Sequence, residues 1–366
     1  MAAVIQDERV RPSSRLTRTL RRPELGALAG TLFVILAFAA FAGDTGLFSS
    51  RGIINVLQVS AELGILASAV ALLMIGGEFD LSIGSIVGFA GVVIGLGVTE
   101  FHLPIGIAVL TAFAFAVLIG YVNGILLIRT KLPSFIVTLA FLFILRGLTL
   151  AVTRGITGRT QIPYIVADDV EGSWVVGLFA GNAFGGLFRW LGEIGIIGLR
   201  PDGLPNIPGI PASVLWWIGV TAVATWVLLS TRFGNWIFAV GGDANAARNI
   251  GVPVARVKII LFILTALAAT LFATIQVLSV GSADTLRGTQ KEFEAIIAAV
   301  IGGCLLTGGY GSAIGAAFGA LIFGFVQMGI FYTGIDTYWF KVFLGSMVLI
   351  AVLFNNYIRH KVTEAK

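Results

Sequence analysis

Few polar side chains in this sequence could do chemistry, and several of them interrupt long apolar stretches. Asn55, Gln58 and Glu62 are spaced at i, i+3 and i+7, which places them on one face of a helix. A carboxylate inside an apolar segment is costly and usually faces a bundle interior or water. The three residues therefore predict either the lining of a polar path through a membrane or hydrogen bonds that hold neighbouring helices together.

A second polar group follows a glycine pair. Asp80 and Ser82 come shortly after Gly76-Gly77, where an apolar run ends abruptly, and Glu78 lies beside them. Asp80 stands just before the next apolar run, as a helix N-cap does. Alternatively, Asp80 and Ser82 belong to the same polar path as the stripe, and we include both among its candidate residues.

Enzymes and metal sites require clusters that this sequence lacks. Its two histidines, His102 and His360, stand far apart, and its one cysteine, Cys304, lies in an apolar stretch. Catalysis or metal binding needs several such groups together. No lysine follows the glycine-rich pattern of a Walker A phosphate-binding loop. We expect no catalytic residue, metal or cofactor in this chain.

The composition indicates a membrane protein. Of 366 residues, 57% are hydrophobic and only 12% are charged, whereas soluble domains carry about 25% charged residues. A soluble domain of this composition would expose apolar surface that it could not cover. The 47 glycines fall largely inside apolar runs, where small residues let helices pack closely in lipid. The expected fold is an all-α polytopic membrane protein.

Apolar runs of about 20 residues, the length that crosses a bilayer, predict about ten transmembrane helices. Loops rich in Lys and Arg stay on the cytoplasmic side, and this rule places both termini there. A basic tail (1–24) and a short tail (358–366) then flank a membrane domain (25–357). The predicted spans are residues 25–43, 53–75, 81–99, 104–128, 133–153, 212–230, 258–280, 293–306, 311–333 and 339–357.

One connection is unusually long. Residues 154–211 join the fifth and sixth predicted spans on the outer side and contain a glycine-punctuated apolar stretch with Trp174 and Trp190. Tryptophan concentrates at the membrane–water interface. We expect this insertion to form an interfacial helix or hairpin on the outer face.

Two helix starts resemble each other. Gly84-Ser85 opens the third predicted span after Gly76-Gly77, and Gly311-Ser312 opens the ninth after Gly308-Gly309. Repeats with interrupted helices are common in transporters and tend to frame the transport path. Such short motifs also match by chance, so an internal repeat and coincidence are both open interpretations.

The cytoplasmic loop at 231–257 has the most defined local pattern. Asp243 is a good N-cap, residues 244–250 predict a helix of two turns, Gly251 suits the left-handed conformation that ends it, and Pro253 prevents its continuation. A short helix with both ends defined is more than a simple connection requires. We interpret it as a docking element for a cytoplasmic partner.

Three residues of this helix suit contact with another protein. Ala246 and Ala247 are small and would permit a close approach, and Arg248 could pair with an acidic rim. A rigid helix also transmits displacement, which a flexible loop would absorb.

A series of short motifs extends over residues 52–357: Gly77–Ser85, Pro133–Leu139, Arg146-Gly147, the loop at 241–253, Ala298–Gly303 and Thr307–Ser312. With these motifs, the chain resembles the permease subunits of ATP-binding-cassette sugar importers, in the branch of ribose-, galactose- and xylose-type systems. Glu78 departs from the resemblance, because the family usually has an apolar residue there, and the insertion at 154–211 is longer than expected.

The resemblance implies a complex in the bacterial inner membrane. Two permeases, identical or different, pair in the membrane, separate ATPase subunits bind ATP and Mg²⁺ and contact the cytoplasmic loops, and a periplasmic binding protein delivers the sugar. ATPase coupling would then fall to Asp243, Ala246, Ala247, Arg248 and Gly251. The path for a monosaccharide or related polyol would fall to Asn55, Gln58, Glu62, Asp80 and Ser82.

The alternative is an autonomous secondary transporter driven by an ion gradient. Such a carrier needs an ionisable group near the middle of the bilayer, and Glu62 is the candidate. It would not need a capped docking helix.

Overall fold

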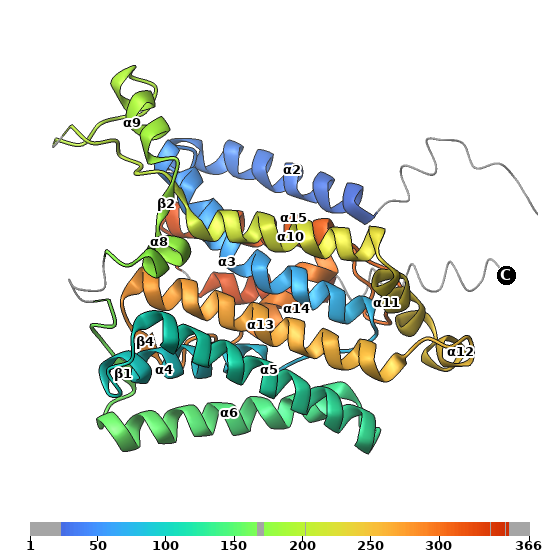
Figure 1. Ribbon diagram of the computed structural model, residues 1–366. Coiled ribbons are helices and arrows are strands. Elements are labelled where there is room, and N and C mark those ends of the chain that lie inside the picture. Colours follow the sequence, from blue (N-terminus) through green and yellow to red (C-terminus); the bar gives the residue numbers. More distant parts are fainter. Residues whose placement is uncertain (1–22, 167–171, 202, 337, 348, 351–366) are drawn as a thin grey trace, which may run out of the picture.

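The computed structural model describes residues 23–166, 172–201, 203–336, 338–347 and 349–350. They form a bundle of long helices that run roughly along one axis (Figure 1). The helices are α2 (Pro23–Ala42), α3 (Ser50–Ile75), α4 (Ile83–Thr99), α5 (Ile105–Thr130), α6 (Ser134–Thr157), α8 (Trp174–Ala180), α9 (Gly185–Glu193), α10 (Ala212–Ser230), α11 (Arg232–Gly242), α12 (Ala244–Asn249), α13 (Val254–Val280), α14 (Lys291–Ile301) and α15 (Ala313–Tyr332).

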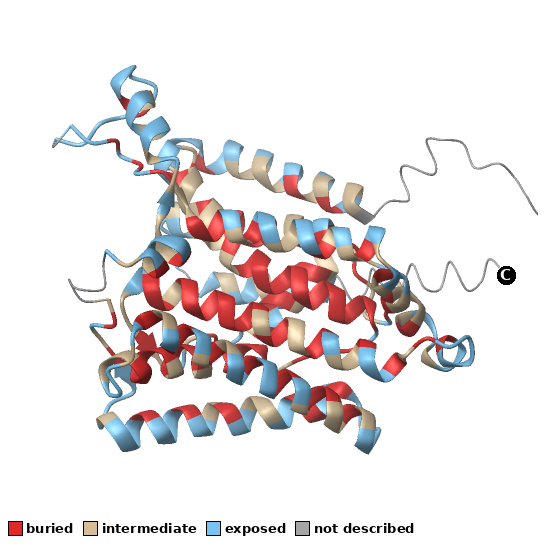
Figure 2. Ribbon diagram, in the orientation of Figure 1, coloured by how far each residue is buried: buried red, intermediate tan, exposed pale blue. Residues whose placement is uncertain are grey.

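The prediction of an all-α polytopic membrane protein is confirmed. Among the described residues, seven helices are long and apolar enough to cross a membrane: α2, α3, α5, α6, α10, α13 and α15. In their apolar stretches 78% of the α3 residues and 67% of the α13 residues are buried, against 17% for α2 and 22% for α6. Thus α3 and α13 form the centre, and the outer helices expose one face, as Figure 2 shows; the exposed side chains of α2 and α6 include Phe33, Leu36 and Phe143.

Fewer complete spans are described than the ten that the sequence predicts. α4 is apolar but has only 17 residues. The eighth predicted span is α14, whose 11 residues extend about 16 Å, roughly half of a bilayer core. Residues 339–347 of the tenth predicted span are helical, and its end lies outside the described residues. The count of ten stays a prediction.

The two ends of the bundle carry different structures. α8, α9 and the short strands gather at one end, and α11 and α12 lie at the other (Figure 1). The long insertion forms two short helices instead of one, because glycines interrupt its apolar stretch. Two antiparallel ladders involve the insertion. Its strand β1 (Gln161–Ile162) pairs with β4 (Ala283–Asp284), which follows α13, and its strand β2 (Asn182–Ala183) pairs with its strand β3 (Ile210–Pro211).

Two helices of the bundle end in the same backbone turn. Gly76 ends α3 with φ −71° and Gly302 ends α14 with φ −67°; Gly77 and Gly303 follow at +83° and +92°, a conformation that favours glycine. In each turn the first glycine amide donates to the carbonyl four residues back, and the second to the carbonyl three residues back. In backbone conformation, Gly76-Gly77 therefore matches Gly302-Gly303 rather than the later pair at 308–309. Helices commonly end in such a turn, so the internal repeat and coincidence both stay open.

Candidate coupling site

The short helix predicted in the cytoplasmic loop is present as α12. The Asp243 Oδ1 accepts hydrogen bonds from the amides of Asn245 (2.8 Å) and Ala246 (3.0 Å). The bonds from Ala246 and Asn245 hold the pKa of the Asp243 carboxyl below its usual range, so the cap is anionic at neutral pH. Gly251 has φ +86° and donates to the Arg248 carbonyl at 3.0 Å. The predicted caps at both ends are confirmed, and the helix stops at Asn249.

The side chains of α12 divide between the bundle and the exterior. Ala246 and Arg248 are exposed, as contact with a partner would require. Ala247 is buried in the core of its own chain, so it holds α12 against the bundle and offers no surface to a partner, contrary to the expectation. Ile250 is 78% exposed, an apolar side chain at the tip of the element. The sequence could not separate these faces, because a helix of six residues has too few positions for a clear periodicity.

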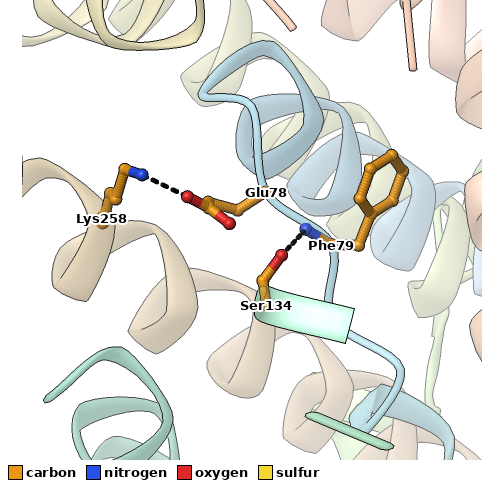
Figure 3. A network of polar contacts seen from close by, with 4 residues as sticks. All are labelled: Glu78, Phe79, Ser134 and Lys258. Atoms are coloured by element: carbon orange, nitrogen blue, oxygen red, sulfur yellow. Dashed lines mark hydrogen bonds and ion pairs between the residues drawn. The ribbon is translucent and has the colours of Figure 1, made fainter. Parts of the chain in front are cut away.

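An ion pair joins the break after α3 to the start of α13. Lys258 Nζ contacts Glu78 Oε1, and the two residues are largely buried (Figure 3). Beside them the amide of Phe79 donates to Ser134 Oγ at 3.1 Å (Figure 3). Lys258 thus explains the acidic residue at position 78. No local sequence signal links the partners, because they are 180 residues apart.

A buried polar network holds the same break. The Asp80 carboxylate accepts from the Ser82 amide (2.9 Å), from Ser82 Oγ (2.5 Å) and from Thr265 Oγ1 of α13 (3.0 Å). Asn123 of α5 donates to Ser82 Oγ at 3.0 Å, and all four residues are buried. The N-cap position of α4 is Ser82 and not Asp80. In this conformation Asp80 and Ser82 tie three helices together and do not line an open path.

Glycines bring three segments into backbone contact next to α12. A Cβ on Gly241, at the end of α11, would lie 1.7 Å from the Ile75 carbonyl oxygen. A Cβ on Gly308 would lie 2.8 Å from Gly77 Cα and from the Gly241 oxygen. The Gly309 amide donates to the Ile75 carbonyl at 2.8 Å. We call this contact of Ile75, Gly77, Gly241, Gly308 and Gly309 the glycine junction. It connects α12, which begins three residues after Gly241, with the break after α3 and the loop before α15.

The polar stripe on α3 is half-buried and bonds to two other helices. Asn55 Nδ2 donates to the Tyr332 hydroxyl of α15 at 3.0 Å. Gln276 of α13 donates to Glu62 Oε2 at 2.8 Å. In this conformation the stripe therefore bridges helices, which was one of its two interpretations. Gln276 is a path candidate that the sequence did not single out, because one glutamine in an apolar helix has no distinguishing pattern.

Breaking the ion pair between Glu78 and Lys258 from one side should destabilise the protein. Lys258→Met leaves a largely buried carboxylate without its cation, which costs roughly 3–5 kcal/mol. Adding Glu78→Gln should recover much of this loss, because an amide needs no counter-ion. Thermal unfolding in detergent measures the effect. If the double variant is no more stable than Lys258→Met alone, the pair does not make the contribution assigned to it.

These features define a polytopic membrane permease. At one end of its bundle, the break after α3 lies next to the capped helix α12. The chain belongs to the family described as the permease component of branched-chain amino acid transport systems, whose model matches residues 52–352. Among solved structures, none matches the chain.

Curated relatives cover most of the chain. The ribose import permease protein RbsC of Escherichia coli K12 is 33% identical over 84% of this chain and 87% of its own length. The xylose transport system permease protein XylH of Haemophilus influenzae is 28% identical over 87% of this chain and 92% of its own length. The probable ABC transporter permease protein YphD of Escherichia coli K12 is 30% identical over 94% of this chain and 92% of its own length.

Proposed function

We propose that this chain is the permease subunit of an ATP-binding-cassette importer in the bacterial inner membrane and forms the translocation path for a monosaccharide or related polyol. The observation that carries the proposal is α12, a short capped helix that connects through the glycine junction to the breaks in the central helices. Relatives named for ribose and xylose import favour a sugar as the cargo. Relatives that are ABC permeases disfavour the alternative of an ion-coupled carrier.

The subunits that the chain lacks follow from this role. Separate ATPase subunits bind ATP and Mg²⁺, a periplasmic binding protein delivers the sugar, and a second permease, identical or different, completes the path. We expect no cofactor or metal in the chain itself.

The proposed topology has about ten spans between cytoplasmic tails at residues 1–24 and 358–366. The insertion at 154–211 lies on the outer face and the loop at 231–257 on the inner face. The opposite placement of α8 and α12 along the bundle supports this arrangement (Figure 1).

The coupling role falls on α12 and its caps. Asp243 and Gly251 fix the two ends of the helix, exposed Ala246 and Arg248 contact the ATPase, and buried Ala247 fastens the helix to the bundle. A displacement of α12 then reaches the membrane helices without being absorbed in a flexible loop.

Deforming the end of α12 tests this role. Gly251→Val forces a β-branched residue into a left-handed conformation, which costs about 1–2 kcal/mol, and no atom lies within 4 Å of the added Cβ. The variant should therefore fold but lose co-purification with the ATPase, or hydrolyse ATP without transport. Gly251→Asn is the matched control, because asparagine tolerates positive φ. Normal ATPase binding and normal uptake in the valine variant would refute the role.

The translocation path is proposed to run beside the stripe on α3. Asn55, Gln58 and Glu62 are half-buried, and Gln276 adds a donor and an acceptor beside Glu62. Asp80 and Ser82 reach such a path only if the break after α3 opens during transport.

Removing the carboxylate of the stripe should slow uptake. Glu62→Leu deletes the acceptor of Gln276 and one of the polar groups that would meet sugar hydroxyls. We expect uptake at least tenfold below wild type with the ATPase still bound, and a smaller loss for Glu62→Gln. Uptake of radiolabelled sugar into proteoliposomes measures both variants. If Glu62→Leu unfolds early in detergent, Glu62 is a packing residue and its place in the path is wrong.

A further inference from the structure

A polar groove lies beside α12 at the same end of the bundle. Its volume is about 870 Å³, and its walls come from α12, the loop between α5 and α6, and the start of α13. Lys131 and Leu132 line it from the loop between α5 and α6, Arg248 from α12 and Arg256 from α13. The ion pair of Glu78 and Lys258 also lines the groove. The groove is large enough for several side chains of another protein.

The charge of the groove is strongly unbalanced. Four cations line it (Lys131, Arg248, Arg256 and Lys258) against one acid, Glu78, which already pairs with Lys258. Lys131, Arg248 and Arg256 are exposed. Within the described part of the chain, no carboxylate forms an ion pair with any of these three. Three uncompensated cations around one concave surface attract an anionic ligand.

We propose that this groove receives an acidic segment of the ATPase, so that the contact between the two proteins is reciprocal: α12 enters the ATPase, and carboxylates of the ATPase enter the groove. The inference rests on the proposed function and deepens it. The groove shares α12 as a wall with the proposed docking element, so one partner covers both surfaces. The partner surface is therefore acidic. At its edge, an apolar side chain contacts Leu132 of the groove, which is 45% exposed.

The floor of the groove gives this contact a consequence. A carboxylate that enters beside Lys258 competes with Glu78 for the same ammonium group (Figure 3). Glu78 belongs to the break after α3, where the amide of the next residue, Phe79, donates a hydrogen bond to Ser134. Docking of the acidic segment would thus loosen the break on the side where α13 begins.

Charge reversal tests the groove. The variant Lys131→Glu/Arg256→Glu should weaken the affinity for the ATPase that purifies with the wild-type chain at least tenfold, with a smaller dependence on salt. The matched control is Arg129→Glu/Arg232→Glu, which changes the net charge equally at two exposed positions that do not line the groove. The control should stay within threefold of wild type. Monodisperse elution and an unchanged unfolding temperature verify that each variant is folded.

The outcomes separate this inference from the proposed function. If Gly251→Val weakens ATPase binding but reversal in the groove does not, the acidic-segment inference is wrong and the coupling role of α12 stands. If the wild-type chain binds no ATPase, both are wrong. The measurement is repeated in nanodiscs of phosphatidylcholine alone. If Lys131→Glu/Arg256→Glu and Arg129→Glu/Arg232→Glu bind the ATPase with the same affinity in these nanodiscs, the ligand of the groove is anionic lipid and the inference is wrong.

Discussion

Alanine at Gly241 is expected to lower sugar uptake at least tenfold, whereas alanine at the adjacent Gly242 should leave it within about twofold of wild type. A Cβ on Gly241 would lie 1.7 Å from the Ile75 carbonyl oxygen and 2.6 Å from the Gly309 amide nitrogen, whereas nothing lies within 4 Å of a Cβ on Gly242. Both glycines are in the last turn of α11, so the change in helix propensity is the same. The contrast therefore isolates the contact in the glycine junction.

The Cβ added at Gly241 would collide with backbone atoms, which cannot rotate away as a side chain can. Overpacking of this kind costs typically about 1–3 kcal/mol, and relief requires α11 to move away from α3 and the loop before α15. Uptake into proteoliposomes and thermal unfolding in detergent are measured for both variants. Similar uptake by the two would show that the junction opens freely and does not link α12 to the breaks.

A second large effect is expected at Asp80. Asp80→Ala removes the acceptor of the Ser82 amide and the Ser82 hydroxyl inside a buried site, and it leaves the Thr265 hydroxyl with only the Phe262 carbonyl as an acceptor. Leaving buried donors unpaired costs roughly 1–3 kcal/mol, and the break between α3 and α4 loses its bond to α13. We expect a lower unfolding temperature and a poor yield of folded protein.

Asparagine at the same position is the control for Asp80. Its Oδ1 can still accept from Ser82, and Thr265 already donates to the Phe262 carbonyl at 2.9 Å, so few donors are left unpaired. Asp80→Asn should therefore be clearly more stable than Asp80→Ala. Equal stability of the two variants would mean that the network does not hold the break.

Local signals were enough to predict α12. Asp243, Gly251 and Pro253 act within one or two turns of the helix that they delimit, so the sequence contains the whole cause. The long apolar spans were predictable for the same reason, because a helix in lipid satisfies its own backbone. Glu62 and Asn55 were also recognised as candidate site residues, because polar residues inside apolar runs stand out.

Contacts between distant segments were not predictable from one sequence. Glu78 meets Lys258 and Asp80 meets Thr265 across 180 and 185 residues, with no local pattern to match them. The sequence compared Gly76-Gly77 with the pair at 308–309, because Gly-Gly occurs at both 302–303 and 308–309 and only the hydrogen bonds distinguish the helix end from the loop. The burial of Ala247 depends on how α12 packs against the bundle, which the local sequence does not show. The sequence therefore placed Ala247 on the partner surface.

Thiol labelling can show whether α12 lies on the cytoplasmic side and contacts the ATPase. In a Cys304→Ala background, single cysteines replace exposed Asn245 on α12 and Trp174, which is 78% exposed at the other end of the bundle. Both variants are treated with a membrane-impermeant reagent in sealed vesicles of each orientation, with and without the ATPase.

We expect the cysteine at position 245 to react only from the cytoplasmic side and to be protected when the ATPase is bound. The cysteine at position 174 should react only from the outside and be unaffected by the ATPase. Labelling of both positions from the same side, or unchanged labelling of position 245 in the presence of bound ATPase, would contradict the claim that α12 is the coupling element of an ATP-driven importer.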